Sequence, residues 1–172
     1  MAQAVALEDT FPKLLLRHAR ERSDRPAIRE KDLGIWQAWT WGQVAEEVRL
    51  LAAGLAARGF TRGMHLAVIG DNRPRLYFAQ LAAQALGGIP VPFYQDAPAP
   101  EMVYVFQDAE IGIAIVEDQE QADKLFEILP QCPMLRHIVF DDPRGFRHYR
   151  REELASYEAL VDAGRAWAEG QP

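Results

Sequence analysis

The sequence is poor in the residues from which many active sites are built. In 172 residues it has one cysteine, Cys132, with two serines, three threonines and three lysines. A single cysteine excludes an intramolecular disulfide and a multi-cysteine zinc site. A phosphate-binding loop needs clustered Gly, Ser or Thr residues with a Lys, and no lysine lies near such a cluster. Neither serine stands in the Gly-x-Ser-x-Gly pattern of a serine hydrolase.

Histidine spacing and net charge exclude further classes of protein. The four histidines, His18, His65, His137 and His148, are far apart and match no metal-ligand spacing. The chain has 19 basic and 25 acidic residues, a net charge of −6, which offers little attraction to nucleic acid. We therefore expect no metal site and no nucleic-acid partner.

Long apolar segments are also missing. The longest uncharged run, residues 76–95, has roughly the length of a membrane span. It contains Gln80 and Gln84, two glycines and two prolines, which indicates a helix, a turn and a strand. The N-terminus has neither the basic lead nor the apolar core of a signal peptide. We expect a soluble, cytoplasmic protein without a transmembrane segment.

The chain has 49% hydrophobic and 26% charged residues, which is typical of globular proteins. Along it, apolar strands are expected to alternate with helices. A helix is expected after Thr10, and a hairpin from residues 27–30 and 35–39. A capping box at Thr40 and Gln43 begins the clearest helix, which ends at Gly59. Its apolar face is Trp41, Val44, Val48, Leu51 and Leu55. Strands are then expected at 64–69, 89–93, 111–116 and 137–140, and helices at 74–86, 98–107, 118–129 and 152–167.

This alternation predicts the fold class. Apolar strands joined by helices imply right-handed βαβ crossovers. The fold class is therefore α/β, with a mostly parallel, doubly wound sheet and helices on both faces.

One link follows a strand and begins a helix, where α/β proteins usually bind ligands: Gly70-Asp71-Asn72-Arg73-Pro74. It has one glycine where a dinucleotide motif needs three, and Pro74 lacks an N–H that an anion would use. We expect Asp71 or Asn72 to cap the helix, with Pro74 at its first position. Ligand contact is the alternative.

Charged clusters have a simple interpretation. Three adjacent carboxylate pairs are predicted to face solvent: Glu46-Glu47, Asp141-Asp142 and Glu152-Glu153. A locally basic cluster is predicted to form an exposed loop, with binding to an anionic headgroup or a partner as the alternative: Arg144, Arg147, His148, Arg150 and Arg151. No residue is assigned a catalytic, cofactor-binding or metal-binding role.

Several segments form an ordered set along the chain. They are the early helix, Trp39-Thr40-Trp41, Gly54-Leu55 with Gly59, Val68-Ile69-Gly70-Asp71-Asn72-Arg73-Pro74, Gly87-Gly88-Ile89-Pro90-Val91-Pro92-Phe93-Tyr94, and Val116-Glu117-Asp118-Gln119 with Lys124-Leu125. From about Thr10 to Trp167, this set resembles the start of the AMP-forming (adenylate-forming) acyl-CoA synthetases, especially the long-chain fatty acid–CoA ligases. Arg75 and Leu76 depart from it, because the family commonly has an acidic residue and a Trp there.

The resemblance implies that residues 1–172 are a partial N-terminal AMP-binding-type domain that ends before the phosphate loop. In the parent enzyme ATP and a fatty acid give an acyl-adenylate and pyrophosphate, and coenzyme A then displaces AMP to form a thioester. Mg²⁺ and a Lys would stabilise the phosphate charge. All these groups would lie downstream, so the segment itself is expected to bind no cofactor, to be structural and to be inactive.

Two alternatives remain. The chain could be a free-standing α/β binding or interaction module without catalysis, or a flavodoxin-like nucleotide-binding domain, against which the missing phosphate loop argues. An exposed edge strand would be open to pairing with a second copy. For the parent enzyme a homodimer and peripheral membrane contact are therefore further expectations.

Overall fold

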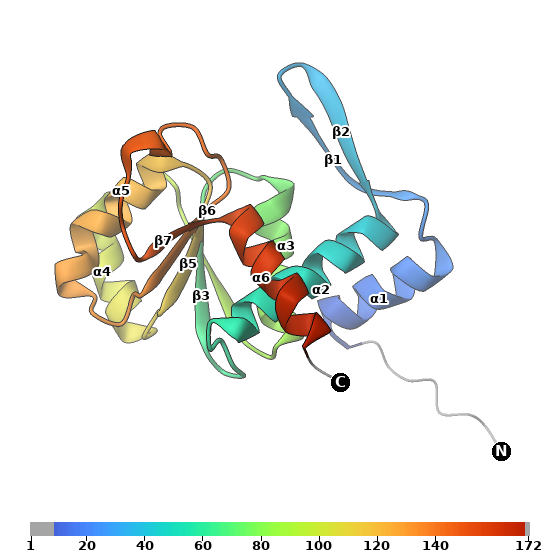
Figure 1. Cartoon of the computed structure of the whole chain (residues 1–172), viewed down its shortest axis with the longest axis horizontal. Coiled ribbons are helices and arrows are strands. Elements are labelled where there is room, and N and C mark those ends of the chain that lie inside the picture. The colour runs from blue at the N-terminus through green and yellow to red at the C-terminus, as the bar shows by residue number, and fades with distance from the viewer. Residues whose placement is uncertain (1–8, 171–172) are drawn as a thin grey trace.

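The computed structural model describes residues 9–170, and its centre is a five-stranded parallel sheet (Figure 1). The strands lie in the order β4-β3-β5-β6-β7. In chain order this is the 2-1-3-4-5 arrangement of doubly wound sheets. The expected α/β class and parallel sheet are confirmed. The strands are β3 (His65–Ile69), β4 (Ile89–Phe93), β5 (Ile113–Val116), β6 (His137–Phe140) and β7 (Leu154–Ser156).

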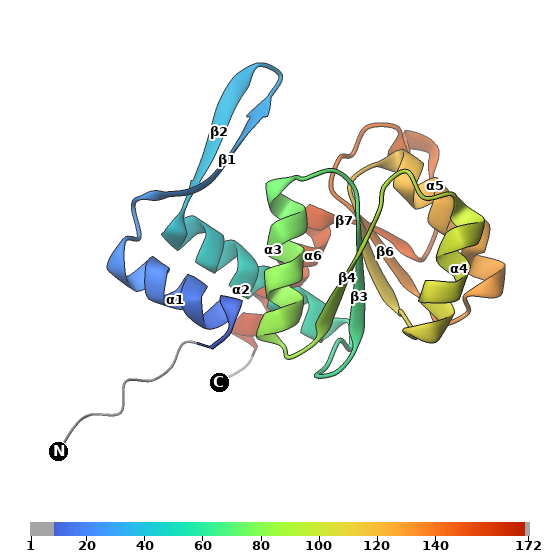
Figure 2. The same cartoon turned by 180° about the vertical axis from the view of Figure 1, so that it is seen from behind.

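Helices cover both faces of the sheet (Figures 1 and 2). One face carries α1 (Phe11–Glu21), α2 (Trp41–Ala57), α3 (Pro74–Ala85) and α6 (Tyr157–Glu169). The other face carries α4 (Ala99–Asp108) and α5 (Gln119–Ile128). Alternate residues of each strand point to opposite faces, so Leu66 and Val68 join the first core cluster while Ala67 and Ile69 join the second.

A two-stranded hairpin projects from this body: β1 (Pro26–Asp32) and β2 (Ile35–Thr40) (Figures 1 and 2). Leu33 and Gly34 form the turn, with φ of 46° and 84°. Positive φ at both central residues is the geometry of the tight turns that join twisted antiparallel strands. The expected hairpin is confirmed.

The predicted helix boundaries are largely confirmed by their caps. The Thr40 hydroxyl accepts from the Gln43 N–H at 3.3 Å, and the Gln43 side chain accepts from the Thr40 N–H at 2.8 Å. The side chains of Thr10 and Asp118 cap α1 and α5 by accepting from the N–H three residues later, without the reciprocal bond. Gly59 follows the end of α2 with a φ of 84°. In the expected apolar face of α2, Val44, Val48, Leu51 and Leu55 are buried, and Trp41 is half-buried against them.

The expected helix over 152–167 is wrong at its start. Leu154–Ser156 forms β7, which pairs in parallel with β6, and α6 begins at Tyr157. Ser156 ends the strand and caps the helix, since its hydroxyl accepts from the Ala159 N–H at 3.1 Å. Three strand residues are too few to show a period, so the pattern merged them with the helix that follows. Within residues 9–170, no helix is long and apolar enough to cross a membrane.

Candidate functional site

The connections of the sheet leave a crevice between β3 and β5, at their carboxyl ends. The chain leaves β3 into α3 on one face and leaves β5 into α5 on the other (Figures 1 and 2). In doubly wound sheets, ligands usually bind where neighbouring connections depart in opposite directions. We refer to Arg73, Arg75, Glu117 and Asp141, which lie at this point, as the switch-point cluster.

Glu117 ties the two connections together. Its carboxylate accepts the Asp71 N–H at 2.6 Å and the Arg73 Nε–H at 2.8 Å. Arg73 also reaches Glu30 of the hairpin at 3.7 Å. A carboxylate of this chain therefore takes a backbone donor of the β3–α3 link that a bound anion would otherwise use.

Gly70 allows this close approach. Its φ is 148°, and a Cβ built there would lie 2.4 Å from Cβ of Glu117 and 2.8 Å from a methyl group of Leu76. L-residues rarely adopt this φ, and the neighbours leave no room for a side chain. Glycine is thus required by the contact between the two connections.

Arg75 forms the second half of the cluster. Its guanidinium donates to Asp141 at 2.8 Å and to Glu158 at 2.7 Å. It also lies 4.6 Å from the ring centre of Tyr157, which is fully buried. One side chain from the start of α3 thereby holds the end of β6 and the start of α6.

Burial and pairing perturb the charges of this site. Burial raises the pKa of Asp141, and the nearby Glu158 and Asp142 act in the same direction, although Arg75 opposes them. Burial likewise raises the pKa of Glu30 against the pull of Arg73. By contrast, the hydrogen bond from Arg144 lowers the pKa of Asp142. Burial disfavours the charge on Arg75, but its two carboxylate partners outweigh burial and raise its pKa.

Two clefts flank the β3–α3 link. The first has a volume of about 300 Å³ and is predominantly acidic, with Glu30, Asp32, Leu33, Arg73, Glu117, Asp141, Asp142, Pro143 and Arg144 around it. The second, of about 340 Å³, lies between the ends of β3 and β4 and contains both polar and apolar groups, including Asp71, Asn72, Tyr77 and Tyr94. Neither has the basic lining that binds a polyphosphate.

The chemistry of these residues is binding and positioning. Arginine–carboxylate pairs with hydrogen bonds orient loops, and none of the four residues of the switch-point cluster is a nucleophile held by a general base. Within residues 9–170, no three His, Cys, Asp or Glu residues are placed to hold a metal ion. The residues present do not fit a nucleotide phosphate, because Glu117 occupies the Asp71 N–H and Pro74 has none.

The capping expected of Asp71 and Asn72 is wrong. Arg73 is the N-cap residue of α3, without a capping bond from its side chain. Asn72 instead accepts a hydrogen bond from the Tyr77 hydroxyl at 2.9 Å. The Asp71 N–H of this loop is instead bound by Glu117. Glu117 is far away in the sequence, so local patterns do not detect this contact. Pro74 does stand at the first turn of α3, as expected.

The solvated role expected of Asp141-Asp142 is also wrong. Their side chains are only 17% and 23% exposed, and each is paired with an arginine. The pair lies at the end of a strand, where the chain enters the crevice. Among the other charged clusters, the exposed basic loop is confirmed at all five positions: Arg144, Arg147, His148, Arg150 and Arg151.

Sequence reasoning missed Arg75 and Glu117. A usable signal existed, since Glu117 directly follows β5 and Arg75 begins the helix after β3. The carboxyl ends of parallel strands meet at one edge of a sheet, so these positions were candidates for contact. Their pairing with Asp141 and Arg73 depends on strand order, which the pattern leaves open.

A profile of the AMP-binding enzyme family matches residues 15–165, most of the chain. The chain belongs to this family. Its match includes every strand of the sheet and the whole switch-point cluster. The resemblance to the N-terminal portion of adenylate-forming acyl-CoA synthetases is thereby confirmed.

Among curated proteins, the chain is similar to the long-chain fatty acid–CoA ligase ACSBG2 of Xenopus laevis, with 28% identity over 130 residues. The match covers 76% of this chain and 18% of that ligase. The chain is 34% identical over 96 residues to the uncharacterised protein Rv1549 of Mycobacterium tuberculosis (strain ATCC 25618 / H37Rv), covering 56% of this chain and 55% of that protein. The chain thus spans about a fifth of the ligase but over half of the second relative.

A solved structure of a CoA synthetase has the same fold. The acetoacetyl-CoA synthetase of Streptomyces lividans superimposes with a TM-score of 0.77 and 24% identity, over 87% of this chain and 24% of that one. At this identity the match establishes the fold alone. This family member therefore has the sheet and helix arrangement found in a synthetase several times its length.

Proposed function

We propose that this chain is the N-terminal part of an ATP-dependent, AMP-forming long-chain fatty acid–CoA ligase. Its domain, residues 1–172, precedes the phosphate loop, and its own role is structural. Long-chain fatty acid–CoA ligases among its relatives support this substrate class. In the parent enzyme, ATP and Mg²⁺ would activate the fatty acid, and coenzyme A would accept the acyl group.

The contacts within the switch-point cluster are the observation that supports a structural role for this chain. In many doubly wound proteins the corresponding crevice receives the ligand. Here Arg73 and Arg75 are paired with carboxylates, and Glu117 occupies a backbone donor of the link. The cluster therefore links the hairpin, three strand ends and two helices, and each of its four side chains is already held in an ion pair.

An ATP–pyrophosphate exchange assay tests whether the isolated chain is inactive. The isolated chain is incubated with ATP, Mg²⁺, labelled pyrophosphate and palmitate, beside a full-length long-chain ligase as positive control. We expect no label in ATP above the enzyme-free blank. Robust exchange by the isolated chain would overturn the structural role.

The size of the polypeptide in its own cells tests membership of a larger enzyme. An antibody raised against the chain is used to probe a cell extract by immunoblot. We expect a band well above 19.4 kDa, the mass of this chain. A single band near that mass would contradict the proposal and favour the second candidate.

The second candidate is a free-standing binding or interaction module without catalysis. The relative of which the matched segment makes up 55% favours it, since that protein is itself far shorter than the ligases. Titration calorimetry of the chain with palmitate and with palmitoyl-CoA tests this candidate. Saturable heat with a stoichiometry near one would support the module, and no heat with either ligand would remove it.

A further inference from the structure

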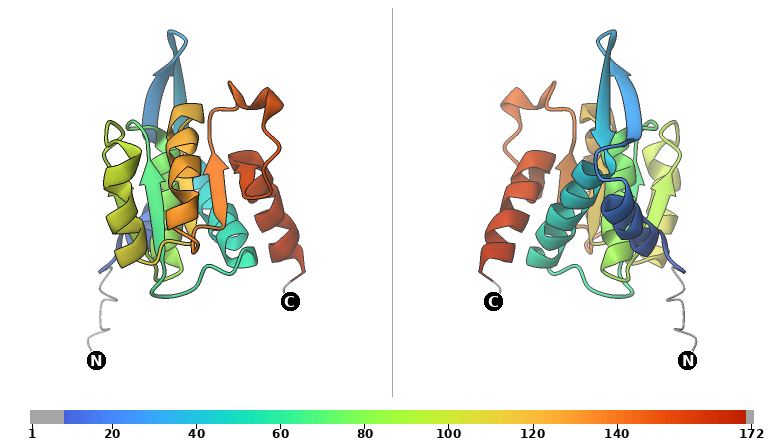
Figure 3. Two further views of the ribbon diagram at one scale, coloured as in Figure 1. Left: turned by 90° about the vertical axis from the view of Figure 1, so that its left-hand side faces the viewer. Right: turned by 90° about the vertical axis from the view of Figure 1, so that its right-hand side faces the viewer.

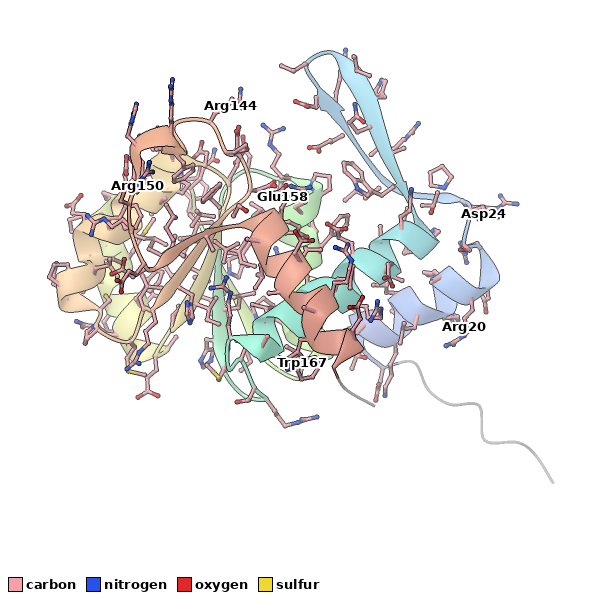
Figure 4. All side chains as sticks on the ribbon, in the orientation of Figure 1. Arg20, Asp24, Arg144, Arg150, Glu158 and Trp167 are labelled. Carbon is pink, nitrogen blue, oxygen red and sulfur yellow. The ribbon has the colours of Figure 1, made fainter. Side chains whose placement is uncertain are left out.

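The amino ends of the parallel strands, at the edge opposite the switch-point cluster, hold a contact between two basic side chains. Arg58 follows the last turn of α2, and His137 begins β6, 79 residues later in the sequence. Nη1 of Arg58 lies 3.3 Å from Nδ1 of His137. In Figure 3, α2 ends at this edge, on the side away from the hairpin. Figure 4 labels Trp167 at the same edge and Glu158 toward the opposite one.

This contact requires a neutral imidazole. A guanidinium has N–H donors and no acceptor, and it stays charged at any physiological pH. Nδ1 of His137 must therefore accept the hydrogen bond, which places the ring proton on Nε2. When a second proton binds at Nδ1, both partners are donors. The hydrogen bond is then lost, and two positive charges face each other.

Partial burial makes two facing charges costly. Burial lowers the pKa of His137, and the nearby Arg58 and Arg136 lower it further. Burial also lowers the pKa of Arg58, whose Nε is buried and has no hydrogen-bond partner among residues 9–170. Within the described part of the chain, neither Arg58 nor His137 forms an ion pair with a carboxylate. The surroundings of His137 thus favour its neutral form.

Glu153 is the carboxylate that the strand register places beside His137. The next residues, Ile138 and Leu154, are partners in the β6–β7 pairing, and both pack in the second core cluster. Because side chains alternate between faces, His137 and Glu153 point to the face that α2 and α6 cover. Glu153 forms no ion pair within residues 9–170. A charged imidazole would have this carboxylate as an alternative partner.

The other elements packed on this face present buried side chains that are apolar or neutral. In the register of β5 and β6, Ile113 is the partner of His137. The buried side chains that α6 adds to the first core cluster are Tyr157, Leu160 and Val161. Burial holds the pKa of Tyr157 well above its usual range, so its hydroxyl stays neutral. The charged groups that decide the ionisation of His137 are therefore the two arginines and Glu153.

We propose that the Arg58–His137 contact is a pH-sensitive switch, which holds the end of α2 on the sheet when His137 is neutral and releases it when His137 is protonated. Release would reach the packing beyond the helix. Phe60 follows the end of α2 and is buried, and a Cβ built at Gly88 would lie 2.4 Å from its ring. Loosening of this segment would therefore affect the entry to both β3 and β4. The inference is independent of the proposed ligase role.

The direction of the pH dependence follows from the lowered pKa of His137. In the unfolded chain His137 titrates near its ordinary value of 6.5, whereas in the folded chain it titrates at a lower pH. The unfolded chain therefore binds the proton more tightly. The contribution of the contact to stability is complete above pH 6.5 and is lost as the pH falls through the folded pKa.

Comparison of wild type with His137→Gln tests the switch. A glutamine side-chain carbonyl can still accept from Arg58, and it does not titrate. Urea unfolding followed by circular dichroism gives the unfolding equilibrium constant of each protein. The ratio of the wild-type constant to that of His137→Gln should rise several-fold as the pH falls from about 7.5 to about 5. A ratio that stays constant or falls over this range would overturn the proposal.

His65→Gln is the matched control. His65 begins β3 as His137 begins β6, but it points to the opposite face, because the next residue, Leu66, packs in the first core cluster. This variant should keep the pH dependence of the wild type. Equal loss of that dependence in His65→Gln and His137→Gln would contradict the assignment to the Arg58–His137 contact.

Hydrogen exchange at Phe60 measures the release of α2. The Phe60 N–H donates to the Leu55 carbonyl at 3.0 Å, across the end of the helix. Its protection, corrected for the intrinsic exchange rate at each pH, should fall on acidification in the wild type and stay constant in His137→Gln. The same protection in both proteins at every pH would show that α2 is not released.

A titration of the imidazole by proton NMR needs no substitution at His137. Its midpoint in the wild type should lie below 6.5 and should move upward in Arg58→Leu, which removes the facing cation. A wild-type midpoint at or above 6.5 would overturn the proposal. It would identify Glu153 as the partner of a charged His137.

Discussion

At the scale of single residues, position relative to the strand ends matters more than residue type. Asp141 and Asp142 are adjacent and chemically identical, yet one faces Arg75 in a buried network and the other is held by Arg144 near the surface. Burial raises the pKa of Asp141, whereas the hydrogen bond from Arg144 lowers the pKa of Asp142. Two neighbouring carboxylates are therefore expected to respond to pH in opposite senses.

Asp141→Asn and Asp142→Asn test this opposition. The raised pKa of Asp141 means that its contribution to stability is complete below its ordinary value of 3.8 and is lost as pH rises through its folded pKa. The free energy of unfolding of Asp141→Asn, relative to wild type, should therefore increase as pH rises from about 3 to about 7. Urea unfolding followed by circular dichroism at several pH values measures this difference.

Asp142→Asn serves as the opposite-sign control. The lowered pKa of Asp142 means that its contribution is present above 3.8 and is lost as pH falls. This variant should lose stability relative to wild type over the range in which Asp141→Asn gains it. Parallel pH profiles for the two variants would show that burial of Asp141 does not govern its ionisation.

At the scale of elements, α2 and α6 pack with their backbones in contact (Figure 3). A Cβ built at Gly164 would lie 1.9 Å from the Leu50 carbonyl oxygen, and one at Gly54 would lie 2.2 Å from that of Leu160. Both glycines have helical neighbours on each side, so their role is close approach of two helices. Gly54 belongs to the segments on which the family resemblance rests, and this contact provides a physical reason for glycine there.

Gly164→Ala should destabilise the protein because the added methyl group must push the helices apart. We expect the free energy of unfolding to fall by about 1–3 kcal/mol. Gly170→Ala is the control, since no atom lies closer than 3.6 Å to a Cβ built there, and its effect should stay within about 0.5 kcal/mol. Urea unfolding measures both, and equal effects would show that α6 can shift without loss.

The edges of the sheet are protected against pairing with another copy. The Ile89 N–H donates to the Met64 carbonyl, which directs β4's odd-numbered residues toward β3 and leaves Pro90 and Pro92 on the outer edge without an N–H. At the other edge β7 is three residues long. Short strands and prolines are common devices against edge pairing, so the structure argues against a dimer formed by strand addition.

Replacing both prolines by valine restores two outward donors on a strand of high β propensity. The double variant Pro90→Val/Pro92→Val should therefore self-associate, whereas Pro100→Val, in the first turn of α4, should not. Size-exclusion chromatography with light scattering at increasing protein concentration distinguishes the outcomes. A double variant that keeps the wild-type mass at every concentration would show that another feature blocks this edge.

At the scale of the whole molecule, two core clusters share one sheet. The first includes the buried faces of α2, α3 and α6, and the second those of α4 and α5. Strands β3, β5 and β6 contribute residues to both. Loss of either cluster would expose one face of every central strand, so the domain is expected to unfold in a single step.

The positions of the tryptophans allow a test of whether the domain unfolds in a single step. Trp39 and Trp41 pack against the first cluster, and among residues 9–170 no tryptophan packs in the second. Leu51→Ala in the first and Ile128→Ala in the second, both at sites that are at most 1% exposed, should each cost about 2–5 kcal/mol. In both variants, tryptophan fluorescence and circular dichroism should give the same midpoint.

Leu16→Ala, at a site 53% exposed, is the control and should change stability by less than about 0.5 kcal/mol. If Ile128→Ala shifts the circular dichroism midpoint and leaves the fluorescence midpoint unchanged, the two faces unfold separately. That result would contradict a single cooperative unit.

Much of this architecture was predictable from the sequence because its signals are local. The Thr40–Gln43 capping box, the apolar stripe of α2 and the stop at Gly59 each depend on residues within a turn or two of one another. Four of the five sheet strands carried enough apolar residues to be expected near their observed bounds. The three-residue β7 did not, because its identity as a strand comes from pairing with β6.

The sequence by itself therefore determined the α/β class, most of the helix boundaries, the family resemblance and the absence of a phosphate loop, all of which follow from local pattern and residue type. The tertiary structure decided the strand order, the pairing of Glu117 with the β3–α3 link, the burial of Asp141 and the meeting of the hairpin with the basic loop at one end. These contacts join residues 44 to 66 positions apart within the switch-point cluster. They exist because parallel strands bring their carboxyl ends to one edge, which no local pattern in the chain encodes.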